Sequence, residues 1–88
     1  MIRLLFTDDF LEEISWLKKH NRKLLKKVSL LCESVKIDPF DGIGKPEGSS
    51  SFAGLWSRRI DKKNRLVYEI LDEKYAEMTS CKDHCDDH

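Results

Sequence analysis

Three polar residues in the second half of the chain are of the types that can cleave a phosphodiester by acid–base chemistry. Glu47 follows Pro46 in a loop, Arg65 follows a polar turn, and His84 lies near the end of the sequence. A carboxylate accepts a proton from an attacking hydroxyl, a guanidinium stabilises the charge on a phosphorane, and an imidazolium protonates the leaving oxygen. With the 2′-hydroxyl of RNA as the nucleophile, this reaction requires no metal ion or cofactor.

Each of the three residues also has an ordinary structural interpretation when it is taken alone. Charged loop residues mostly face water, so Glu47 by itself predicts little. Arg65 fits a surface ion pair with Glu69 or Asp61, which would contribute little to stability. His84 alone fits a solvated tail residue. The catalytic hypothesis therefore depends on the three side chains lying together.

The segment that must position Arg65 is Gly54–Tyr68, which has the pattern of a β-hairpin. Residues 55–60 and 65–71 are strand-forming runs, and the polar residues 61–64 form the turn between them. Three arginines lie on this hairpin. The face of the sheet on which each side chain lies decides which arginines can contact a substrate.

The length of the turn sets the register of this hairpin. A four-residue turn places Ile60 opposite Arg65 and Arg58 opposite Val67. Arg58 and Arg65 then share the exposed face, whereas Arg59 lies on the more apolar face that meets the core. A one-residue bulge would exchange Arg59 for Arg58.

The first part of the chain predicts a strand followed by two helices. Residues 2–6 form an apolar run, and Thr7 followed by Asp8 and Asp9 is typical of a helix N-terminus. This helix is expected to fade near residues 20–21, and a second should begin within a residue or two. The apolar residues at helical spacing are Phe10, Ile14 and Leu17 in the first helix and Leu24, Val28, Leu31 and Val35 in the second.

The remaining elements complete an α+β fold. Residues 38–51 contain both prolines and three of the four glycines, which predicts an ordered turn and then a flexible loop. After the hairpin, residues 75–81 supply a last strand. The predicted order is β-α-α-β-β-β, a small antiparallel sheet packed on an N-terminal two-helix hairpin, in a single domain over residues 1–88.

Charge is distributed unevenly, although the formal net charge is zero. Residues 1–65 hold fourteen lysines and arginines against nine acidic residues, and residues 66–88 hold two against seven. A solvated helix face is the commoner explanation of a basic run, but this density also favours contact with a phosphate backbone. The basic residues on the outer faces of the two helices are Lys18, Lys19, Arg22, Lys23, Lys26 and Lys27.

The apolar runs and the cysteines indicate the compartment. No run approaches the length of a transmembrane helix, and residues 2–6 are too short a run for a signal peptide. Three cysteines, with Cys32 in the helical apolar pattern, argue against a disulfide framework. We therefore expect a cytoplasmic protein.

Cys81, His84, Cys85 and His88 form a competing set, because thiolates and imidazoles are the usual zinc ligands. Four tetrahedral ligands from one eight-residue segment would need a tight loop, and no second element is present to hold it. We therefore predict no metal site.

Four motifs resemble, in the same order, those of the YoeB/Txe branch of the RelE/ParE superfamily of bacterial toxins. They are GKPE at 44–47, GLWSRRI at 54–60, RLVY at 65–68 and C-x-x-H at 81–84, so the resemblance covers nearly the whole chain. It implies a small sheet against two helices, a RelE-like fold related to microbial ribonucleases. Members are mRNA interferases that act on mRNA in the ribosomal A site and are neutralised by a cognate antitoxin.

The resemblance also implies roles for individual residues. Glu47 matches the family's general base, Arg65 its phosphate-stabilising arginine, His84 its general acid, and Arg59 a further cationic position. The other substrate-binding candidates are Arg58, Lys45, Phe52 and Cys85, the last in the position of the family's tyrosine. The implied partners are mRNA, the ribosome, an antitoxin and a second copy of the chain, without a metal, a cofactor or a membrane.

The sequence is also compatible with two alternative functions. Because Cys85 replaces a tyrosine and residues 48–53 contain no lysine, the chain could be a catalytically weakened protein of the toxin fold that mainly binds an antitoxin-like partner. Another branch of the superfamily poisons DNA gyrase, but in such a protein the set of Glu47, Arg65 and His84 would have no purpose.

Overall fold

A capping hydroxyl fixes the start of the first helix. In the computed structural model, which describes residues 1–82, α1 (Asp8–His20) follows Thr7, whose side-chain oxygen accepts a hydrogen bond from Phe10 N at 3.1 Å. Asp8 and Asp9 lie in the first turn, where their charge complements the helix dipole. The predicted N-cap is therefore confirmed.

Asn21 connects this helix to the next by acting as a cap for both. Its backbone N–H donates to Leu17 O at 2.8 Å at the end of α1, and its Oδ1 accepts from Leu24 N at 3.0 Å at the start of α2 (Arg22–Ile37). One residue thus makes the whole turn of the helical hairpin. Within residues 1–82, neither helix is long and apolar enough to cross a membrane.

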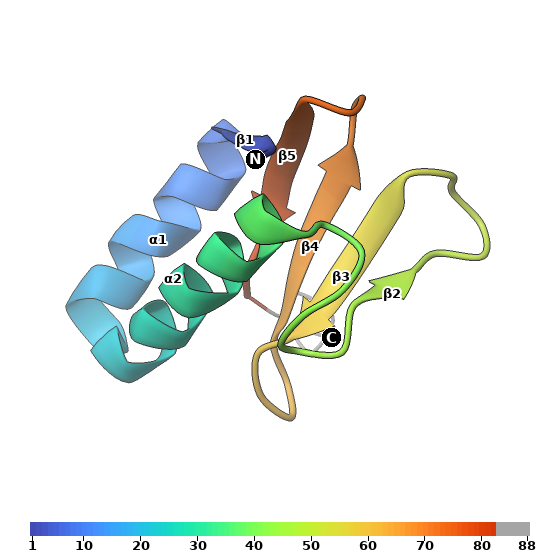
Figure 1. The fold of residues 1–88 in the computed structure, drawn as a ribbon. Coiled ribbons are helices and arrows are strands. Elements are labelled where there is room, and N and C mark those ends of the chain that lie inside the picture. Colours follow the sequence, from blue (N-terminus) through green and yellow to red (C-terminus); the bar gives the residue numbers. More distant parts are fainter. Residues whose placement is uncertain (83–88) are drawn as a thin grey trace.

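Both helices pack on the same face of a five-stranded sheet (Figure 1). The strand order is β1-β5-β4-β3-β2, and β4 pairs antiparallel with β3 and with β5. The predicted α+β architecture is therefore confirmed. The strands are β1 (Arg3–Phe6), β2 (Glu47–Gly48), β3 (Leu55–Arg59), β4 (Arg65–Ile70) and β5 (Tyr75–Ser80).

Two strands depart from the predicted antiparallel sheet. β1 pairs parallel with β5, and because the two strands lie at opposite ends of the chain and no tight turn joins them, their connection does not require an antiparallel pairing. The two-residue β2 forms within the expected loop and pairs antiparallel with β3. The sheet is consequently mixed, and Glu47 lies on its edge strand.

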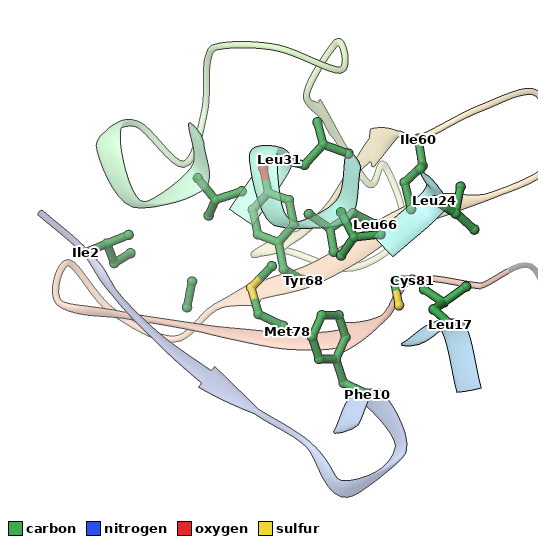
Figure 2. Close-up of a cluster of buried hydrophobic side chains, with 13 residues drawn as sticks. Ile2, Phe10, Leu17, Leu24, Leu31, Ile60, Leu66, Tyr68, Met78 and Cys81 are labelled. Atoms are coloured by element: carbon green, nitrogen blue, oxygen red, sulfur yellow. The ribbon is translucent and has the colours of Figure 1, made fainter. Parts of the chain in front are cut away.

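The core lies between the helices and the sheet (Figure 2). Leu66 and Tyr68 of β4 and Met78 of β5 have no exposed surface, and they face the apolar stripes of the two helices. Among residues 1–82, no helix lies on the opposite face of the sheet (Figure 1). The buried helical residues are Phe10 and Leu17 of α1 and Leu24, Val28, Leu31 and Val35 of α2.

The predicted register of the β3–β4 hairpin was wrong by one residue. Arg59, not Ile60, pairs with Arg65, so the turn contains the five residues 60–64 instead of four. The Asp61 carboxylate accepts hydrogen bonds from the backbone N–H groups of Lys63 and Asn64, which closes this longer turn. As a result Arg59 shares the helix-free face with Arg65, and Arg58 points toward the helices.

Arg58 is therefore a core residue and not the surface residue that the four-residue turn predicted. It is fully buried, and its Nε donates to Tyr68 Oη at 3.1 Å. Its Nη1 and Nη2 donate to Ser34 Oγ at 2.7 Å and to three backbone carbonyl oxygens of residues 38–43. No donor direction is left for a substrate, so we withdraw Arg58 as a binding residue.

Burial of two thiols makes the stability of the fold sensitive to alkaline pH. Burial raises the pKa of Cys32 to about 11 and, together with the nearby Glu13 carboxylate, the pKa of Cys81 to about 12. Above pH ~9 an unfolded thiol loses its proton while the folded thiol keeps it, so the free energy of unfolding should fall as the pH rises from about 9 to 12. Urea unfolding between pH 7 and 10 should show this decline, and the Cys81→Ala variant should show a shallower one. An equal slope in both proteins would contradict the assignment.

Candidate active site

The short strand β2 brings Glu47 next to Arg65. Glu47 pairs with Ser57 of β3, and Ser57 lies on the same face as Arg65 of β4. The Arg65 Nη2 atom is 3.2 Å from Glu47 Oε1. Two of the three residues proposed for catalysis are therefore in contact, although 18 residues separate them in the sequence.

Ser57 holds the guanidinium of Arg65 in place. Its Oγ accepts from Arg65 Nε at 3.2 Å and from Arg65 Nη2 at 3.0 Å. Sequence reasoning did not single out Ser57. The alternation of side chains along a strand would have revealed it, because Ser57 lies two residues before Arg59 and so faces the same side.

Both charged groups remain open to solvent. The side chain of Glu47 is 73% exposed and that of Arg65 is 39% exposed. An exposed ion pair contributes little to stability, so the fold does not require this one. Its accessibility allows an incoming phosphate to take the place of the Glu47 carboxylate on Arg65.

A shallow pocket of about 250 Å³ adjoins the pair. This volume is below the roughly 300–1,000 Å³ that is common for small-molecule sites. The residues that line it are Glu47, Gly48, Ser49, Leu55, Trp56, Ser57, Arg65 and Val67.

A second cation lies beside the pair, on the same face. Arg59 is exposed and lies directly opposite Arg65 in the β3–β4 ladder. Like charges in this arrangement usually destabilise a sheet, and a bound polyanion would relieve their repulsion. The Arg59 backbone N–H also donates to Gly44 O at 2.7 Å, which ties the GKPE segment to this strand.

Gly44 allows that close approach. It has a φ of 83°, and a Cβ atom there would lie 2.7 Å from Leu31 Cδ2. The next residue, Lys45, is exposed and has a φ of 51°, which lysine seldom adopts. Lys45 thus lies on a sharply bent segment two residues before Glu47.

The aromatic candidate lies in the loop between β2 and β3. Phe52 is 66% exposed. The Ser49 Oγ accepts from the backbone N–H groups of Ser51 and Phe52, both at 3.1 Å, which shapes this loop. Its exposed ring is open to stacking.

His84 and Cys85 lie outside the described residues. They also belong to the alternative zinc set, whose His88 lies outside the described residues as well. Within residues 1–82, no group of three or more metal-ligating side chains is present. The end of β5 can nevertheless be followed. Ser80 pairs with Val67, and Thr79 Oγ1 donates to Val67 O at 3.0 Å.

This pairing defines where the C-terminal segment leaves the sheet. β4 begins at Arg65 and runs antiparallel to β5, so β5 ends beside the start of β4. The described chain therefore ends next to the strand that carries Arg65.

Comparisons with known structures define the class of protein. The YoeB dimer from Staphylococcus aureus superposes with a TM-score of 0.83 and 33% sequence identity, over 94% of this chain and 97% of that one. The YoeB-YefM complex from the same organism gives 0.81 and 34%, over 96% and 98%. The fold is thus that of a small bacterial toxin, which is also the class of the YoeB/ParE toxin from Agrobacterium tumefaciens.

Sequence comparison then gives the family. Residues 6–85 match the family described as YoeB-like toxin of bacterial type II toxin-antitoxin system. Toxin YoeB of Synechocystis is 40% identical over 84 residues, covering 94% of this chain and 96% of that protein. The chain therefore belongs to the YoeB-like toxin family, as its four motifs predicted.

Proposed function

We propose that this toxin is a ribosome-dependent endoribonuclease, an mRNA interferase that cleaves mRNA in the ribosomal A site. The observation that carries the proposal is the 3.2 Å contact between Glu47 Oε1 and Arg65 Nη2 on an open, cationic face of the sheet. A base and a phosphate-binding cation are thereby adjacent and accessible. That arrangement suits acid–base cleavage of a bound RNA strand.

Each residue has one role in the proposed reaction. Glu47 takes the proton of the 2′-hydroxyl, and the 2′-oxygen then attacks the adjacent phosphorus. Arg65, oriented by Ser57, stabilises the charge on the non-bridging oxygens. The bond from phosphorus to the 5′-oxygen breaks, and His84 protonates that oxygen. The products are a 2′,3′-cyclic phosphate and a 5′-hydroxyl end.

The remaining candidates would hold the RNA strand. Arg59 and Lys45 are exposed cations at the site and would contact flanking phosphates. Phe52 would stack on a base, since its ring is exposed. Cys85, which directly follows His84 in the sequence, is the last of these substrate-binding candidates.

Partners are part of the proposal. The two Staphylococcus aureus structures are a YoeB dimer and a YoeB-YefM complex. By analogy we propose that this chain binds a cognate antitoxin, forms a homodimer and acts in the cytoplasm, where ribosomes are found.

The test is cleavage of one mRNA with and without ribosomes. Purified toxin should cut the mRNA when it is loaded on ribosomes that hold an A-site codon, and should leave the free mRNA intact. Equal cleavage of both would contradict ribosome dependence. Cleavage of neither, by a protein that binds an antitoxin normally, would support the catalytically weakened alternative.

The basic helical face should provide part of the affinity for ribosomes. All six of its lysines and arginines are exposed. Replacing Lys19 and Lys23 with glutamate should weaken ribosome binding roughly 10-fold near 0.1 M salt and should reduce its salt dependence, because fewer counterions are released. Lys74→Glu, at an exposed position in the β4–β5 turn, is the control. Equal effects of the two changes in a binding titration would rule out this face.

A further inference from the structure

A buried carboxylate on α1 holds the backbone where β5 ends. Glu13 is only 8% exposed, which is unusual for glutamate. Its Oε1 accepts hydrogen bonds from Cys81 N at 2.7 Å and from Lys82 N at 3.1 Å. Two consecutive amide groups thus converge on one oxygen, so the direction of the chain at residues 81–82 is fixed from the helix.

A second contact from the same helix acts on the same residues. The Lys82 Nζ atom lies 3.7 Å from the centre of the Trp16 ring, a cation–π contact. Trp16 lies three residues after Glu13, on the same side of α1. His20, one turn further, stacks on Trp16 with ring centres 4.6 Å apart. Helix α1 therefore contacts both the backbone of residues 81–82 and the side chain of Lys82.

Burying a glutamate here is costly unless its hydrogen bonds are needed. A fold could end this strand with a solvated loop at no such cost. The buried Glu13 therefore indicates that the direction of the chain after β5 has to be fixed.

We propose that Glu13 is a positioning residue for the C-terminal segment that carries His84, with Trp16 and Lys82 as its second support. The inference rests on the proposed function, in which His84 is the general acid. His84 follows Lys82 by two residues, and β5 ends beside the strand of Arg65. Loss of the contacts that hold residues 81–82 is therefore expected to impair the step that needs the general acid.

The test compares two RNA linkages in ribosome-bound mRNA. One has the normal 5′-oxygen leaving group, and the other has a 5′-sulfur, which leaves without being protonated. Glu13→Leu should lower the single-turnover rate on the oxygen linkage roughly 10- to 100-fold, as expected for a misplaced catalytic group. On the sulfur linkage Glu13→Leu should match the wild type. His84→Ala should show the same pattern.

Two further variants separate positioning from folding. Glu13→Gln keeps an acceptor oxygen and should retain nearly the wild-type rate. Lys82→Leu removes only the cation that contacts the Trp16 ring. It should show a smaller defect than Glu13→Leu, again confined to the oxygen linkage. If Glu13→Leu does not fold, the rates of Glu13→Gln and Lys82→Leu test the proposal instead. Glu12→Leu, at an exposed neighbouring position on α1, is the control and should leave both rates unchanged.

The outcomes distinguish this inference from the proposed function. A defect of Glu13→Leu or Lys82→Leu that is equal on both linkages would show a general loss of structure and would overturn the positioning role, as would a normal rate on both. If the wild type cleaves neither linkage, the proposed function itself fails.

Discussion

Replacing Glu47 with alanine is expected to lower the single-turnover cleavage rate of ribosome-bound mRNA by about 10²- to 10⁴-fold, the usual contribution of a general base. The side chain is 73% exposed and lies on the edge strand β2, so its loss should leave the fold intact. Cells that express the variant should grow, whereas cells that express the wild type should stop growing.

Arg65 should show an effect of similar size. Arg65→Met keeps much of the side-chain volume but removes both the contact with Glu47 and the cation that faces the phosphate. Arg65→Lys should restore little, because a single ammonium cannot reproduce the forked contacts with Ser57 and a phosphate.

The control for both sites is Glu73→Ala, an exposed carboxylate in the turn at the other end of β4. It should cleave at the wild-type rate. Normal cleavage by Glu47→Ala would show that another group takes the proton. Normal cleavage by Arg65→Met would remove the proposed phosphate site.

The second large effect concerns stability and involves the adjacent pair Arg58 and Arg59. Arg58→Leu should lower the free energy of unfolding by at least about 3 kcal/mol, because several buried acceptors would lose their donor at once and each costs ~1–3 kcal/mol. Those acceptors belong to α2, to β4 and to the loop that leads to Glu47. Arg58→Lys should recover little of the loss, since one ammonium cannot reach all of them.

Arg59→Leu is the matched control, since it removes the same side chain from the next, exposed position. Its effect on stability should stay within about 0.5 kcal/mol. Urea unfolding of the two variants side by side measures the difference. Equal midpoints would contradict the core position of Arg58, and a more stable Arg59 variant would agree with relief of its repulsion from Arg65.

Local signals were sufficient to predict most of the fold. Thr7 and the two aspartates that follow it define a helix start through contacts within one turn, and the apolar stripes of α1 and α2 repeat at the helical period. These features depend on neighbouring residues only, so the sequence alone carries them.

The register of the hairpin depended on a finer detail. Ile60 is apolar and looks like the last residue of a strand, but it lies in the turn, where its N–H donates to Asn64 O at 3.0 Å. That single residue exchanges the faces of Arg58 and Arg59. Hydrophobic pattern could not decide between them, because Trp56 lies on the face of Arg58 and Leu55 on the face of Arg59, so each face of the strand carries an apolar side chain.

The contact within the candidate site could not be read from the sequence without the family resemblance. Glu47 and Gly48 form a strand of two residues, which has no periodicity, and it exists because β3 offers an open edge. Gly48 also lets this strand lie close to Trp56, since a Cβ atom there would be 3.2 Å from the indole Cζ2. Long-range pairing of this kind is a property of the folded sheet.

The central claim is that this toxin cleaves mRNA by attack of the 2′-hydroxyl while the mRNA is on the ribosome. The most direct measurement is to map the ends of mRNA fragments after brief expression of the wild type and of Glu47→Ala. We expect breaks at A-site codons, with 2′,3′-cyclic phosphate and 5′-hydroxyl ends, in the wild type only. Growth arrest without such breaks, or the same breaks in Glu47→Ala, would contradict it.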